Sequence, residues 1–110
     1  MQIGQGEPPD KAARTRLPNR RQAETISFSR DGSSYQMTIG FYSNGTIGEL
    51  FLSADRCDSL LNVMVHDAAI AVSLALQHGC PLQTIAHAVK RNARDEPASP
   101  IGAALDRIVP

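Results

Sequence analysis

The first half of the chain alternates apolar and polar residues with a period of two, which is typical of half-buried strands. The alternation runs through residues 25–29, 35–41 and 46–52. Asp31-Gly32 and Asn44-Gly45 separate these segments, and both dipeptides are strong signals for tight hairpin turns. The pattern therefore predicts a three-stranded antiparallel meander with one apolar face.

The second half has helical periodicity and begins with a long helix. Residues 60–78 contain neither proline nor glycine. Asp58 or Ser59 can accept hydrogen bonds from the first free amides, as N-cap residues do. Gly79 suits the left-handed position that commonly follows a helix. These signals predict one helix that ends at His78.

Two shorter helices are expected after the long one. Pro81 suits the first position of a helix that continues to Val89. Ser99 can cap a last helix that extends to about Ile108. Strands followed by helices define an α+β fold, here a meander followed by one long and two shorter helices.

The faces of the long helix suggest what covers it. A broad apolar arc leaves a polar stripe about 60° wide at 100° per residue. The stripe consists of Ser59, Asn62, His66, Ser73 and Gln77. So little polar surface favours a homodimer in which the helix or the sheet forms the contact, because interface cores are depleted in charge. The alternative is that the monomer's own sheet and helices cover the arc. The candidate interface residues are Val65, Val72, Asn62, Ser73 and Gln77.

The N-terminal segment differs from the rest in charge and composition. Residues 1–23 hold five basic and two acidic residues, a net charge of +3, whereas residues 24–110 hold six basic and nine acidic residues, a net charge of −3. Because the segment has few large apolar residues, we expect residues 1–20 to be a flexible basic arm and residues 21–110 to be a single domain. A basic arm can bind phosphates, although a solubilising tail has the same composition. The candidate phosphate-binding residues are Lys11, Arg14, Arg16, Arg20 and Arg21.

Cysteine usage and hydropathy indicate the compartment. Cys57 and Cys80 are 23 positions apart, so we expect free thiols in a reducing cytosol. Residues 1–10 have no apolar stretch of the kind found in a signal peptide. The weakly polar stretch Ala68–Leu76 is shorter than the roughly 20 residues that cross a bilayer. The sequence therefore predicts a cytoplasmic protein without a membrane partner.

The side chains that could carry chemistry are not arranged in known catalytic or metal-binding patterns. Zinc ligands usually occur in close pairs, but Cys57, Cys80, His66, His78 and His87 show no such spacing. We expect no metal site. His66 and Asp67 are adjacent, and adjacent helical residues do not face each other, so an acid–base pair is not expected. Glu49 alternates with Leu50 in the third strand and is either exposed or a buried acid that serves a site. We expect it to be exposed, because carboxylates are seldom buried unpaired. No catalytic residue is assigned.

Several segments, taken in order, resemble a known family. Leu17-Pro18-Asn19-Arg20-Arg21 precedes the first strand, residues 45–52 form the third, and residues 67–79 end the long helix. Pro81-Leu82 and residues 98–102 open the two later helices. From residue 17 to residue 108 the chain is similar to the TSCPD-type domain at the C-terminal end of adenosylcobalamin-dependent (class II) ribonucleotide reductases. The Thr-Ser-Cys-Pro-Asp segment that names the domain is absent.

The resemblance implies a role linked to deoxyribonucleotide synthesis. Class II reductases use adenosylcobalamin, a barrel and several cysteines, which 110 residues with two separated cysteines do not supply. We therefore carry over no catalytic or cobalamin-binding residue and expect no cofactor for this chain. The leading hypothesis is a non-catalytic interaction or regulatory module that self-associates or docks to a reductase. The alternative is a nucleic-acid or nucleotide-binding module that uses the basic arm, and an independent small enzyme is a third reading.

Overall fold

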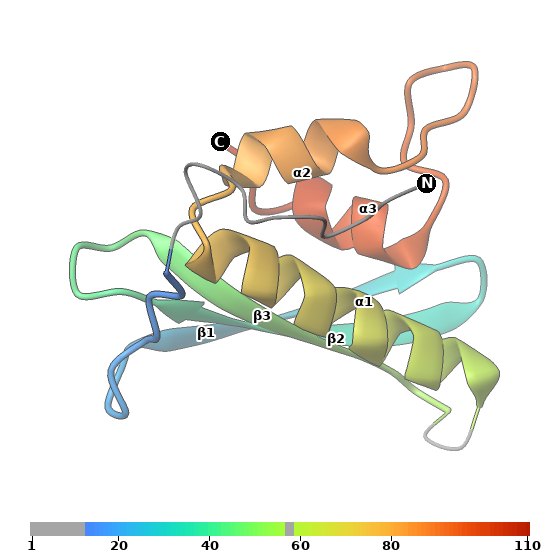
Figure 1. Ribbon diagram of the computed structural model, residues 1–110. Coiled ribbons are helices and arrows are strands. Elements are labelled where there is room, and N and C mark those ends of the chain that lie inside the picture. Colours follow the sequence, from blue (N-terminus) through green and yellow to red (C-terminus); the bar gives the residue numbers. More distant parts are fainter. Residues whose placement is uncertain (1–12, 57–58) are drawn as a thin grey trace, which may run out of the picture.

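A three-stranded sheet followed by three helices forms the structure, a computed structural model that describes residues 13–56 and 59–110. This order confirms the predicted α+β fold (Figure 1). The elements are β1 (Ala23–Arg30), β2 (Ser33–Phe41), β3 (Ile47–Ala54), α1 (Leu60–Gln77), α2 (Leu82–Ala88) and α3 (Pro100–Asp106). The predicted helix starts at residues 60 and 100 are confirmed, and each strand is slightly longer than its period-two pattern indicated.

The sheet has the order β1-β2-β3, and both strand pairs are antiparallel. The first turn uses left-handed backbone at Asp31 (φ 50°) and Gly32 (φ 80°), and the second uses Gly45 (φ 88°). Positive φ at these positions matches the right-handed twist of a tight hairpin. The two predicted turn signals therefore place the strands in the predicted meander, in which β3 is an edge strand.

One face of the sheet supplies most of the core. Met37, Ile39, Leu50 and Leu52 are at most 2% exposed. Near the end of this face the rings of Phe28 and Tyr35 stack with centroids 5.2 Å apart. The guanidinium of Arg107 lies 4.2 Å from the Phe28 ring centroid, in cation–π geometry. The contact between Arg107 and Phe28 thus attaches the C-terminal segment to the sheet.

The ends of α1 follow the predicted signals. The Ser59 side chain accepts a hydrogen bond from the amide of Asn62. At the other end Gly79 adopts φ 94°, its amide bonds to the Leu76 carbonyl, and the Cys80 amide bonds to the Ala75 carbonyl. These paired bonds form a Schellman motif, which satisfies carbonyls at the end of the helix. The helix therefore stops one residue before the predicted end.

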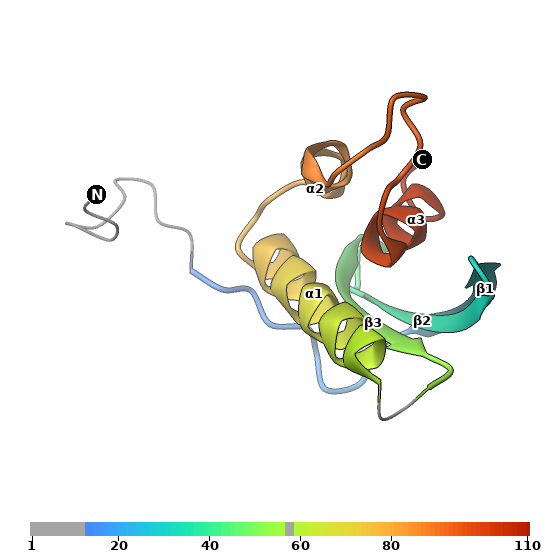
Figure 2. The same cartoon turned by 90° about the vertical axis from the view of Figure 1, so that its right-hand side faces the viewer.

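The shorter helices pack above the sheet. Ser99 caps α3, whose first residue is Pro100. Pro81 is the N-cap residue of α2 and not its first helical residue, and α2 ends at Ala88, one residue before the predicted Val89. In both views α3 lies over the sheet beside α1, and α2 lies further from the sheet (Figures 1 and 2).

The long helix has the length and apolar composition of a membrane span, as judged over the described residues. The expectation based on the shorter stretch Ala68–Leu76 was wrong on this point, because the apolar segment extends over Leu60–Gln77. Only 22% of this helix is buried. Its buried apolar residues, Val65, Ala69 and Val72, nevertheless join the core of the sheet, so α1 is part of a compact globular domain.

Candidate interaction surface

The polar stripe of α1 binds the free edge of β3. The Asn62 carbonyl Oδ1 accepts a hydrogen bond from the Ala54 amide at 2.9 Å. The Ser73 hydroxyl accepts from the Leu50 amide and donates to the Leu50 carbonyl, both at 2.9 Å. An edge strand presents unpaired backbone groups that attract other strands. The helix supplies side-chain partners for these groups and thereby covers the edge.

Gln77 extends this arrangement to the start of β3. Its Nε2 donates to the Gly48 carbonyl at 3.0 Å, and its Oε1 accepts from Arg14 Nε at 2.6 Å. Gln77 is 4% exposed. Burial of this amide is tolerable because both of its ends are hydrogen-bonded.

These contacts correct the reasoning behind the predicted interface. Val65 and Val72 are buried in the core of the chain itself, and Gln77 is buried and hydrogen-bonded to Gly48 and Arg14. Asn62 and Ser73 bond to β3. The prediction assigned the partner contact to the side of α1 that packs against β3 and the core. Helical periodicity separates the faces of a helix, but it does not show what covers each face. The homodimer stays a prediction, but these five residues do not form an exposed surface.

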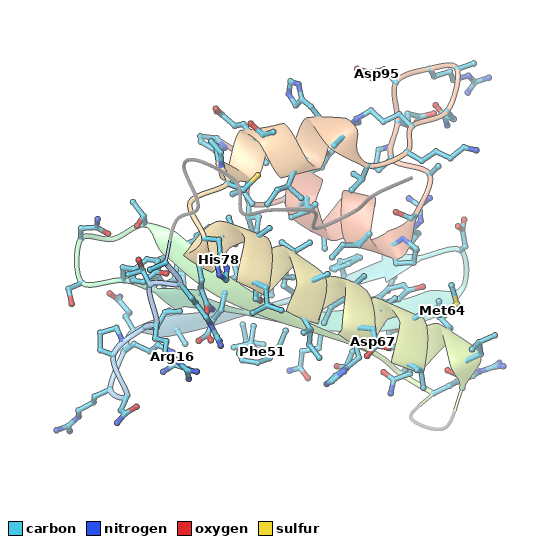
Figure 3. The ribbon with its side chains drawn as sticks, viewed as in Figure 1. Arg16, Phe51, Met64, Asp67, His78 and Asp95 are labelled. Carbon is cyan, nitrogen blue, oxygen red and sulfur yellow. The ribbon has the colours of Figure 1, made fainter. Side chains whose placement is uncertain are left out.

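The exposed face of α1 is apolar instead. Every large hydrophobic side chain that is exposed among the described residues lies on α1 or beside it on β3. Their exposed fractions run from 39% to 74%, and the set is Phe51, Leu60, Val63, Met64, Ile70 and Leu74. We call these six residues the α1–β3 apolar surface. Figure 3 shows Phe51 projecting from the sheet below α1, with Met64 on the helix beside the labelled Asp67.

The described part of the predicted arm is attached to the domain. The Thr15 amide donates to the Gln77 carbonyl at 2.7 Å, and the Tyr42 hydroxyl donates to the Thr15 carbonyl. Leu17 is half-buried. Low apolar content did not predict these contacts, which hold residues 13–17 against the end of α1. Residues 1–12, including Lys11, lie outside the described residues, and flexibility of the arm stays a prediction.

Arg21 forms an ion pair with Glu49 on the outer face of the sheet. Arg21 Nε lies 2.5 Å from Glu49 Oε2. Glu49 is 8% exposed, so the expectation that it is exposed was wrong. The acid is accommodated because its neighbour on β2 is Gly40, where an added Cβ would lie 2.2 Å from Glu49 Oε2. Alternation placed Glu49 on the correct face, but it could not show that Arg21 covers that face.

The five candidate phosphate-binding residues have different environments. Arg14 bonds to Gln77, and Arg21 bonds to Glu49 and to the Pro18 carbonyl. Arg16 and Arg20 make no hydrogen bond or ion pair with the residues that the structure describes. Arg16 lines an open groove of about 530 Å³ beside Tyr42 and Gly79. Of the four candidate arginines that the structure describes, Arg16 and Arg20 thus remain available to bind an anion, and Lys11 lies outside the described residues.

The remaining chemical groups do not converge. Within residues 13–56 and 59–110, no three His, Cys, Asp or Glu side chains could hold a metal ion together. Cys80 is a free thiol, and Cys57 lies outside the described residues. His66 Nδ1 does approach Asp67 Oδ1, at 3.7 Å, contrary to the expectation for adjacent helical residues. Both side chains are more than half exposed, which makes this a solvated surface pair.

The loop between α2 and α3 is held by Arg91. Its guanidinium donates to Asp106 on α3 and to the Asp95 carbonyl at 2.7 Å. The hydrogen bond with Asp106 raises the pKa of Arg91 above the ordinary value for arginine, and the nearby negative charges raise it further. Asn92 accepts amide bonds from Arg94 and Glu96, which orders the loop tip.

The fold and these surfaces define an α+β domain without an assembled catalytic constellation among the described residues. Residues 8–107 match the family model of the TSCPD domain, and the chain therefore belongs to the TSCPD domain family. This result confirms the resemblance derived from the sequence.

The chain is also similar to parts of much longer enzymes. It is 39% identical over 88 residues to a vitamin B12-dependent ribonucleotide reductase of Streptomyces coelicolor, a match that covers 80% of this chain and 9% of that protein. It is 37% identical over 70 residues to the reductase of the same name from Agrobacterium fabrum, which covers 64% of this chain and 6% of the enzyme. The Bradyrhizobium diazoefficiens reductase is 34% identical over 88 residues, or 80% of this chain and 7% of the enzyme. The chain thus spans less than a tenth of each reductase. No solved structure matches.

Proposed function

We propose that this protein is a non-catalytic interaction or regulatory module linked to deoxyribonucleotide synthesis. It acts in the cytoplasm by binding a vitamin B12-dependent ribonucleotide reductase. The observation that carries this proposal is the 39% identity over 88 residues to a segment of such a reductase. A fold alone does not define a function, so the proposal rests on this similarity to a reductase segment.

The roles of the polar side chains support binding rather than chemistry. Glu49 is paired with Arg21, and Ser73 and Gln77 bond to the backbone of β3. These groups are occupied in holding the fold. The exposed side chains of Arg16 and Arg20 have no hydrogen-bond or ion-pair partner among the described residues, which leaves them available for contact with another macromolecule.

No cobalamin-binding role is proposed for this chain. A groove of about 610 Å³ beside Tyr35 and Asn62 opens to solvent at the end of the sheet. Ligand sites usually enclose 70–90% of a small molecule. An open groove lined mainly by small polar residues does not provide such enclosure, so no reaction step is assigned through the cofactor.

The proposal is tested with a reductase whose own TSCPD segment has been deleted. The purified chain is added to the truncated enzyme and to the intact enzyme, and binding and the rate of ribonucleotide reduction are measured. We expect binding to the truncated enzyme with a Kd below about 10 µM, or about −7 kcal/mol, and a change in its rate. The intact enzyme, whose own segment occupies the site, should bind the chain more weakly.

The control for this experiment is the chain alone, which should not reduce ribonucleotides with or without adenosylcobalamin. Failure of the chain to bind either reductase would contradict the proposal. Turnover by the purified chain above a blank without protein would contradict its non-catalytic part.

The availability of Arg16 and Arg20 favours a second candidate function, binding of nucleic acid or nucleotides. Phosphate contacts by cations release counterions, so the affinity falls steeply as salt rises. If this function is correct, single-stranded DNA should bind in a salt-dependent manner, and the double variant Arg16→Ala/Arg20→Ala should bind more weakly and with a shallower dependence on salt. Arg94→Ala is the matched control, because Arg94 is exposed in the loop between α2 and α3. Binding that is independent of salt, or equal in both variants, would exclude this function.

A further inference from the structure

The α1–β3 apolar surface spans two elements whose relative position is fixed by hydrogen bonds between α1 and β3. Asn62 bonds to Ala54, and Ser73 bonds to Leu50. Phe51 lies on β3 between these two attachment points, and Ile70 lies on the helix between them. The edge contacts therefore hold Phe51 near the middle of the helix. Figure 3 shows Phe51 below α1.

This surface is almost without charge. Residues 60–77 of α1 contain no lysine or arginine, and Asp67 is their only carboxylate. Non-obligate interfaces are about as apolar as the rest of the protein surface, whereas homodimer interfaces are more apolar, at about 65%. A helix face with a single carboxylate lacks the charges that would select a different partner. Its composition therefore fits a surface that binds a copy of itself.

The exposed area is of the size that a dimer requires. The six side chains are 39–74% exposed. Together they leave roughly 300–500 Å² of apolar surface in water, if each large side chain offers about 100–150 Å². A specific interface buries about 800 Å² on each partner, of which about 500 Å² is apolar in a homodimer. The surface supplies most of that apolar part from one face.

We propose that the α1–β3 apolar surface is the interface of a homodimer, in which α1 packs against α1 of a second copy across a twofold axis near Ile70. A twofold interface places the same patch on both subunits. Asp67 lies three residues from Ile70, so in antiparallel helices the two Asp67 residues are about 9 Å apart along the helix direction at 1.5 Å per residue. Asp67 is three or four residues from Val63, Met64 and Ile70, so it is the one carboxylate within this face. Its side chain is 74% exposed and lies 3.7 Å from His66 Nδ1. This inference does not depend on the proposed binding to a reductase.

Sedimentation of the purified chain tests the dimer directly. The mass should be about twice the 11.8 kDa of one chain at micromolar concentration. Ile70→Asp should weaken the dimer at least about 100-fold and give a monomer, because it places a charge at a desolvated apolar contact. Thr84→Asp is the matched control, since it adds the same charge at an exposed position of α2 and should leave the dimer intact.

A second variant covers the case in which Ile70→Asp does not fold, as judged by circular dichroism. Phe51→Thr replaces the exposed ring by a β-branched residue that suits a strand, and it should also weaken the dimer. A wild-type chain that is still monomeric at about 100 µM would have a dimer dissociation constant above that concentration. This result would overturn the proposal. So would a folded Ile70→Asp or Phe51→Thr variant that dimerises as the wild type does. A monomer that still binds the truncated reductase would overturn the dimer and leave the proposed function standing.

Discussion

The two helices that pack beside each other on the sheet, α1 and α3, differ in how much of their apolar surface they bury. In the short helix α3, four of the seven residues are buried, and Leu105 has no exposed surface. In the longer helix α1, only four of 18 residues are buried. The longer helix contributes less of itself to the core because it lies along the edge of the sheet, whereas α3 lies over its face. Position relative to the sheet, more than hydrophobicity, decides the burial of a helix here.

The residues of each helix match its position. α3 approaches the sheet through Ala103 and Ala104, which are at most 4% exposed, and the absence of a side chain at Gly102 leaves room for Pro97. At Gly102 an added Cβ would lie 3.1 Å from Pro97 Cβ. α1 instead carries Asn62 and Ser73, which bond to the exposed backbone of β3. Small residues serve close packing over a face, and polar residues serve a strand edge.

The comparison predicts its largest effect for a matched pair of leucines. Leu105→Ala should lower the free energy of unfolding by about 2–5 kcal/mol, because it opens a cavity in a filled core. Leu60, on α1, is 74% exposed, and Leu60→Ala should cost less than about 0.5 kcal/mol, as surface changes do. Both are measured by urea denaturation in the Ile70→Asp background, which removes any contribution from self-association. Equal losses in the two variants would contradict the assignment of α3 to the core and α1 to the edge.

Much of this fold could be predicted from local patterns. The turns at Asp31-Gly32 and Asn44-Gly45, the cap at Ser59 and the glycine at Gly79 each act within a few residues, so the sequence signals were sufficient for the strands and helices. Period-two alternation also identified which strand residues face the core, such as Ile39 and Leu52.

The candidate surface could not be predicted in the same way. A helical wheel assigns Val65 and Ser73 to different faces, but it contains no information about the strand that lies beside the helix. The polar stripe was interpreted as a surface for a partner, whereas Ser73 bonds to Leu50, a residue 23 positions earlier. Likewise, the pairing of Arg21 with Glu49 joins residues 28 positions apart. Contacts between distant segments decide which face is covered, and local periodicity does not report them.

A second prediction concerns the edge contact of α1. Ser73→Ala removes both the acceptor for the Leu50 amide and the donor to its carbonyl. Leu50 is 1% exposed, so water cannot easily replace these bonds. We expect a loss of about 1–3 kcal/mol in the free energy of unfolding. Ser53→Ala is the control, since Ser53 is exposed on β3 and should be nearly neutral. If the two serine variants have the same stability, the edge contact is not stabilising.

The helix caps provide a smaller and more closely matched test. Ser59 accepts from the amide of Asn62 at 3.0 Å, and Ser99 accepts from the amide of Gly102 at 3.2 Å. Replacing either serine by alanine should cost about 1 kcal/mol. The loss should be larger for Ser99→Ala, because Gly102 is buried and Asn62 is partly exposed. Replacing either serine by glycine should cost only a few tenths of about 1 kcal/mol, because glycine is tolerated at the N-cap position. A larger loss of stability for Ser59→Ala than for Ser99→Ala in thermal unfolding would contradict this prediction.

The smallest expected effect involves Arg91, which joins the loop before α3 to Asp106 on that helix. The hydrogen bond with Asp106 raises the pKa of Arg91 above the ordinary value for arginine. A raised pKa in the folded state means that the stability from this charge is fully present below the ordinary pKa and is lost only as the pH rises through the folded value. Arg91→Ala should therefore lower the Tm slightly, and by the same amount at pH 6 as at pH 9. Arg94→Ala, in the same loop, is the control and should leave the Tm unchanged, because the Arg94 side chain makes no hydrogen bond or ion pair among the described residues. A Tm difference between wild type and Arg91→Ala that changes from pH 6 to pH 9 would show that another titrating group, and not the guanidinium, controls this contact.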